Sequence, residues 1–85
     1  MTLPLESQAT REVARFIASH PSPAQVIAFT ASPEVVERAY ALINAERERP
    51  LTDAEQKEME NYLLLQHLMI IAKVEAHRQL QQQAS

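Results

Sequence analysis

The 85-residue chain contains no glycine, no cysteine and no tryptophan. Because the tightest β-hairpin turns depend on glycine, its absence disfavours a sheet built from short hairpins. The lack of glycine also leaves no glycine-rich loop that could hold a phosphate group. The absence of cysteine excludes disulfides, thiolate metal ligands and a cysteine nucleophile, and it is typical of a cytoplasmic protein.

A long apolar run is missing as well. The longest mostly apolar stretch, residues 62–74, is interrupted by Gln66, His67 and Lys73. At about 13 residues it is too short and too polar to cross a bilayer. Residues 1–6 carry neither the basic region nor the apolar region of a signal peptide. We therefore expect a cytoplasmic protein with no membrane segment.

What the chain does contain favours helices. Hydrophobic residues make up 46% of the sequence and charged residues 22%, with a net charge of −3. This balance is neither that of a disordered chain nor that of a fibrous one, and alanine, leucine, glutamate and glutamine are abundant. We expect one all-α domain covering residues 1–85, of a size at which a small core is often supplemented by oligomerisation.

Prolines and capping residues divide the chain into four helices. The residue before a proline is pushed out of the α region, so a helix ends before it. A Ser-Pro pair supplies a capping hydroxyl followed by a proline suited to the first helical position. Thr52 and Glu55 have the spacing of a capping box. These signals predict helices over residues 5–19, 23–29, 33–48 and 52–82.

The last two helices should form an antiparallel hairpin, because residues 49–52 leave only a short connection. The expected fold is a small all-α bundle: a helical hairpin with a long C-terminal helix, extended by two N-terminal helices. The glutamine-rich residues 79–85 are expected to fray. At about 1.5 Å per residue the last helix is nearly twice as long as its hairpin partner. We therefore expect Val74, Ala76 and Leu80 to project beyond the monomer's core.

The long helix carries apolar residues on two opposite sides, at about 100° per residue. The first line is expected to pack within the hairpin, and the second has the spacing of a coiled-coil seam and is predicted to be an interface. The first line consists of Leu63, Leu64, Ile71 and Val74, with His67 among them. The second line consists of Tyr62, Leu65, Met69, Ala72, Ala76 and Leu80. We therefore expect a dimer or another protein partner, with a monomeric four-helix bundle as the alternative.

His67 is a candidate pH-sensitive residue. It lies among apolar residues, so we expect its ring to be buried and neutral and its protonation at about pH 6 to weaken the folded or associated state. A core or interface histidine satisfied by one hydrogen bond is the simpler interpretation.

No pattern of catalytic, cofactor-binding or metal-ligating residues is present. None of the three histidines has a ligand partner three or four positions further on, as a helical metal site needs. The carboxylates at positions 53, 55, 58 and 60 are placed to offset the dipole at the start of a helix. We therefore predict a protein that is not an enzyme and that uses no cofactor or metal.

Nucleic-acid binding has a weaker basis. Arg11 and Arg15 share one side of the first predicted helix, and Arg47 and Arg49 lie at the hairpin. Glutamates interleave with all four arginines, which is more typical of a mixed, solvated surface than of a basic patch.

Four segments of the hairpin form a further pattern: ASPE at 31–34, ALINAER at 41–47, LTDAE at 51–55 and ENYLLLQHL at 60–68. Together they resemble a pattern shared by a group of small bacterial proteins that is common in cyanobacteria. Such proteins are similar to antitoxins and are often encoded beside genes for nuclease or toxin-like proteins. The resemblance covers residues 31–78 and supplies no catalytic residue. It departs from the group at residues 48–50, where a glycine turn is usual.

Three functions follow as hypotheses. The first is an antitoxin-like or regulatory adaptor that binds and masks a protein partner, such as a nuclease or toxin-like protein, through its long C-terminal helix. The alternative is a self-associating structural protein, and the third is a nucleic-acid-binding regulator.

Overall fold

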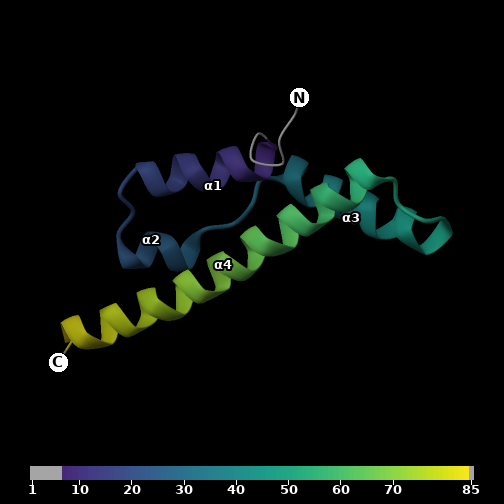
Figure 1. The fold of residues 1–85 in the computed structure, drawn as a ribbon. Helices are drawn as coiled ribbons and strands as arrows, with labels where there is room; N and C mark the ends of the chain where they lie inside the picture. Colours follow the sequence, from purple (N-terminus) through teal and green to yellow (C-terminus); the bar gives the residue numbers. More distant parts are fainter. Residues whose placement is uncertain (1–6, 85) are drawn as a thin grey trace.

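The computed structural model describes residues 7–84, and within them the chain forms four helices and no strand. These helices are α1 (Gln8–Ala18), α2 (Pro23–Ala28), α3 (Pro33–Glu48) and α4 (Asp53–Ala84), drawn in Figure 1. The predicted all-α fold with a long C-terminal helix is therefore confirmed. Residues 5 and 6, where the first helix was expected to begin, lie outside the described residues. The helix that was expected to fray from residue 79 continues through Ala84.

Short polar side chains begin the helices, as the capping signals predict. Ser22 accepts a hydrogen bond from the backbone N–H of Gln25, whose side chain accepts one in return from the Ser22 N–H. Thr52 and Glu55 make the same reciprocal pair at the start of α4. Each pair satisfies amides that have no partner within their own helix. The predicted starts of α2 and α4 therefore rest on capping boxes.

The turn between α1 and α2 is made without glycine. The N–H groups of Ser19 and His20 bond to the carbonyls of Phe16 and Ile17, each at 3.1 Å. His20 has a φ of 55°, in the left-handed region that glycine usually occupies after a helix. Pro21 follows directly, so the helix cannot continue.

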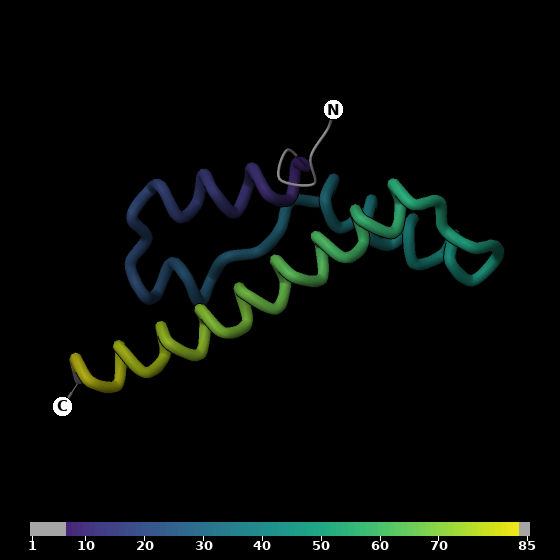
Figure 2. Tube along the Cα trace, in the orientation of Figure 1, coloured from purple at the N-terminus to yellow at the C-terminus, as the bar shows by residue number. Residues whose placement is uncertain are grey.

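The longest helix, α4, is the axis of the molecule. Figure 2 shows that α4 runs antiparallel to α2 and α3, with α3 beside its first half, α1 alongside its middle and α2 beside its second half. Its most extensive contact is with α2. The result is an elongated and thin molecule, with principal extents of 52 × 27 × 18 Å.

The core is small and lies on one side of α4. Leu42 is the most deeply buried of its large side chains, with 2% of its surface exposed. The buried core residues are Val13, Val35, Ala39, Leu42, Met59, Met69 and Ala76. Three of these belong to α3 and three to α4, while α1 adds Val13. The hairpin therefore supplies most of the core, and the N-terminal helices extend it.

One expectation about the end of α4 is wrong. Ala76 was expected to project beyond the monomer's core, yet it is only 3% exposed. The helix α2 lies along the second half of α4, which α3 is too short to reach (Figure 1). Val74 does project, with 53% of its surface exposed. The helix therefore remains covered on one side as far as Ala76.

Polar contacts hold the N-terminal helices against α4. The Asn61 amide group donates to the hydroxyls of Ser7 and Thr10, at 3.0 and 2.9 Å. Further along α4, Lys73 Nζ donates to the backbone carbonyl of Phe29 at 2.8 Å. These bonds join residues far apart in the sequence and fix both ends of the α1–α2 pair on α4.

Candidate protein-binding surface

A row of large apolar side chains on α4 is exposed to solvent. We call it the outer face. Each of its members has between 47% and 67% of its surface exposed. The outer face consists of Leu63, Leu64, Leu68, Ile70, Ile71 and Val74. Single exposed apolar residues are common on proteins, but a contiguous set on one rigid helix is typical of a binding surface.

The outer face points away from the protein's own core because of the helical repeat. Ile71 is about 160° around the helix from Met69, and Val74 about 160° from Ala76, at about 100° per residue. Met69 and Ala76 are buried against the rest of the chain, so Ile71 and Val74 face away from it. One helix therefore has one covered side and one bare side.

The six residues predicted as an interface lie on the covered side. Met69 and Ala76 are buried, at 8% and 3% exposure. The other four are half-buried: Tyr62, Leu65, Ala72 and Leu80. A partner could reach Met69 or Ala76 only by displacing helices of the protein's own chain. Their participation in an interface stays a prediction, and the surface that is available in this structure is the opposite one.

The expectation that the first line of apolar residues on α4, which begins at Leu63, packs within the hairpin is wrong. Leu63, Leu64 and Ile71 are 52%, 67% and 49% exposed, and Met59 packs against α3 in their place. Small residues at positions 72 and 76 suit the close approach of a neighbouring helix. The helix in most extensive contact with α4 is α2 of the same chain. Leu68 and Ile70, which neither predicted line included, widen the bare side, and Ile70 at its edge also lines a cavity with Phe29 and Met69.

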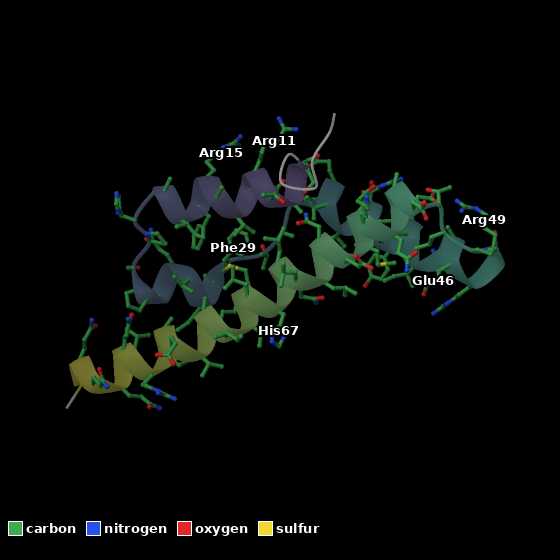
Figure 3. The ribbon with its side chains drawn as sticks, in the orientation of Figure 1. Arg11, Arg15, Phe29, Glu46, Arg49 and His67 are labelled. Atoms are coloured by element: carbon green, nitrogen blue, oxygen red, sulfur yellow. The ribbon has the colours of Figure 1, made fainter. Side chains whose placement is uncertain are left out.

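His67 lies within the outer face and is exposed. Figure 3 shows its ring on the side of α4 that faces away from α1 and α2. The ring is therefore not buried within the single chain. Its burial in an associated state, and the pH-sensitive contact that depends on that burial, stay predictions.

Next to the outer face, α3 and α4 form an open groove. Tyr40 and Ile43 of α3 and Leu63 of α4 line it, and Tyr40 is 62% exposed. The apolar surface of α4 thus continues onto α3 near Leu63. This widens the bare side at the hairpin end of the molecule.

A second concave region lies under the connection between α2 and α3. This cavity, of about 310 Å³, is lined mainly by apolar side chains, among them Val13, Phe29 and Met69. Its two charged groups are already engaged: Lys73 bonds to the Phe29 carbonyl, and Glu12 accepts hydrogen bonds from Ser32. The cavity therefore offers no free charged group to orient a polar substrate.

Two acidic residues have clear structural roles. Hydrogen bonds from Ser32 to the Glu12 carboxylate lower the pKa of Glu12 below its usual value. The Arg49 guanidinium and the Thr52 N–H lower the pKa of Glu55 to about 2. Both carboxylates act at helix starts, where negative charge is also favoured by the helix dipole. Neither is arranged as a general acid or base.

The basic side chains do not gather into one patch. Figure 3 shows Arg11 and Arg15 along α1 and Arg49 at the far tip of the hairpin. Arg49 forms an ion pair with Glu55 at 2.8 Å, and Arg38 forms one with Glu58 at 2.7 Å. Separated and partly neutralised arginines give little attraction for a phosphate backbone.

Residues 7–84 also lack the features of a metal site and of a membrane-spanning helix. In this part of the chain no three histidine or acidic side chains are grouped so that they could hold a metal ion. None of its helices has both the length and the apolar character that crossing a membrane requires.

Comparison with known proteins identifies no relative. No protein-family model, no curated protein and no solved structure matches this chain. The resemblance of residues 31–78 to antitoxin-like bacterial proteins accordingly stays a prediction.

Proposed function

We propose that this protein acts by binding another protein chain through the outer face of α4. One observation carries the proposal: six large apolar side chains on one rigid helix are each about half exposed. Covering apolar surface is favourable by roughly 25 cal/mol for each Å² removed from water. A helix face of this kind binds a partner helix or an apolar groove, as amphipathic recognition helices do.

The rest of the described molecule serves to present this face. The caps at Ser22, Ser32 and Thr52 fix the helix starts, and Asn61 and Lys73 bond α4 to the N-terminal helices. A partner that covers the outer face leaves these contacts intact. The role is that of an adaptor or antitoxin-like protein, which works by occupying a surface and carries out no reaction.

A photo-crosslinking amino acid can test the face directly. It replaces Ile71 on the outer face in one variant and Arg11 on the opposite side of the molecule in the other, each produced at native level in the cells of origin. We expect ultraviolet light to give a discrete protein adduct from position 71 and none from position 11. No adduct from position 71, or the same adducts from both positions, would contradict the proposal.

A further inference from the structure

We infer that the outer face of α4 binds a second copy of this chain, with the two α4 helices antiparallel and centred near residue 69. The inference rests on the proposed function and names the partner. It follows from how charges and apolar side chains are distributed along the face.

The middle line of the outer face has the repeat of a coiled coil. Its members are spaced alternately by four and three residues, which keeps them facing one partner helix. The line consists of Glu60, Leu64, His67, Ile71, Val74 and Arg78. All six residues are exposed. The ends of the line therefore carry opposite charges, and its centre is largely apolar.

An antiparallel partner matches this line to itself. If Ile71 lies opposite His67 of the second copy, then Leu64 lies opposite Val74 and Glu60 lies opposite Arg78. The two-fold axis repeats each pair, so the dimer has two Glu60–Arg78 pairs, one at each end. Such an interface is isologous: the same patch serves both chains.

A parallel partner fits the charges badly. With the helices in register, Glu60 would face Glu60 and Arg78 would face Arg78. Like charges placed opposite each other destabilise a helix pair, and opposite charges favour the arrangement that brings them together. The sign of the charge at each end therefore selects the antiparallel arrangement.

The flanking positions agree with the same axis. Ile70 lies on one side of the middle line and Leu68 on the other. In the antiparallel pair, Ile70 faces Ile70 of the second copy, and Leu68 faces Leu68 of the second copy. Both contacts lie close to the two-fold axis. These side chains are 54% and 47% exposed in the single chain, so the pairing covers apolar surface at the centre of the contact.

The contacts that Glu60 and Arg78 make within the single chain do not prevent them from pairing with a second copy. Arg78 has a long ion pair with Glu75 of its own helix, at 3.7 Å, and both side chains are more than half exposed. No ion pair of Glu60 is found within the described part of the chain. An exposed, poorly formed pair of this kind contributes little, so Arg78 can turn to a new carboxylate at small cost.

A charge swap tests the arrangement. We expect sedimentation equilibrium of the purified protein at micromolar concentration to give twice the monomer mass of 9.6 kDa. Glu60→Arg and Arg78→Glu should each raise the dimer dissociation constant about tenfold, because each creates two like-charge pairs per dimer. The double variant, with both charges exchanged, should regain the parent constant. Arg47→Glu, at an exposed position of α3, is the control and should change nothing.

The outcomes separate this inference from the proposed function. A monomeric parent whose crosslinker at position 71 captures a protein of another mass overturns the dimer and leaves the proposed function standing. A dimer that ignores the single swaps, or that the double swap does not restore, overturns the antiparallel arrangement. Loss of every adduct from position 71 overturns both. Far-UV circular dichroism matching the parent shows that each variant is folded.

Discussion

The side chain of Lys73 on α4 donates a 2.8 Å hydrogen bond to the backbone carbonyl of Phe29, the residue that ends α2. Carbonyls at the end of a helix have no partner within it, so a donor from elsewhere is needed. The ring of Phe29 also packs on that of Phe16, with ring centres 4.5 Å apart. Phe29 therefore joins α1, α2 and α4 at one point.

Lys73→Met should weaken the contact between α4 and Phe29. Methionine keeps much of the apolar stem and removes the donor, and a hydrogen bond from a charged group contributes about 1.5 to 3 kcal/mol. Because Lys73 is only half-buried, we expect a loss of about 1 kcal/mol in the free energy of unfolding, measured by urea denaturation. Lys57→Met, at an exposed position of the same helix, is the control and should stay within about 0.5 kcal/mol of the parent.

Two helix caps should differ in their contribution to stability. Thr52→Ala removes one acceptor for the Glu55 N–H and should cost about 1 kcal/mol. Ser32→Ala removes the acceptor for the Val35 N–H and also the hydroxyl that donates to Glu12 on α1. We expect it to cost about twice as much, because the Glu12 contact crosses between helices. Equal thermal melts for the two variants would show that the Glu12 contact contributes nothing.

Acid should destabilise the fold in a defined range of pH. The folded-state pKa of Glu55 is about 2 and that of Glu12 is also below its usual value. Such groups stabilise the fold above their unfolded pKa, about 4.3, and lose that contribution as pH falls through the folded pKa. The free energy of unfolding should therefore decrease from about pH 4.3 towards about pH 2.

Glu12→Gln provides the test of the acid response. The variant should be less stable than the parent at neutral pH and should lose less stability on acidification, as chemical denaturation at several pH values would show. Glu37→Gln, at an exposed position of α3, is the matched control. An unchanged pH profile for Glu12→Gln would leave Glu55 alone as the source of the effect.

Two glutamate substitutions distinguish the sides of α4. Met69→Glu places a charge at a position only 8% exposed and without a partner, so it should unfold the protein. Ile71→Glu places the same charge where half of the side chain is exposed, so the helices should remain while association is lost. Far-UV circular dichroism with sedimentation measures both effects. If the Met69→Glu variant stays folded, then the side of α4 that carries Met69 is not the covered side.

Local signals in the sequence predicted most of the fold. The serines and threonine that begin the helices are recognisable because their hydrogen bonds join residues three positions apart, and the short connection at residues 49–52 determined the hairpin. The bounds of α3 agree with those predicted, and α2 ends one residue earlier than expected.

The covered side of α4 could not be predicted in this way. Both sides carry apolar residues, and the choice depends on contacts over long distances in the sequence, such as those from Asn61 to Ser7 and from Lys73 to Phe29. Residue size alone does not decide between the two sides, because small residues suit a close neighbour from the same chain or from another. Alanines at positions 72 and 76 suit a closely packed neighbour, whereas six large side chains remain outside. The exposed position of His67 follows from the same reversal.

The elongated shape affects how the size of the molecule in solution must be measured. A compact chain of this length has a radius of gyration of about 12 Å, whereas this one has 15.2 Å and extends 52 Å along its longest axis. Such a monomer leaves a gel-filtration column early, at the volume of a heavier spherical protein. An elution volume calibrated with compact standards would therefore suggest a dimer even for a single chain, and only methods that measure mass independently of shape distinguish the two.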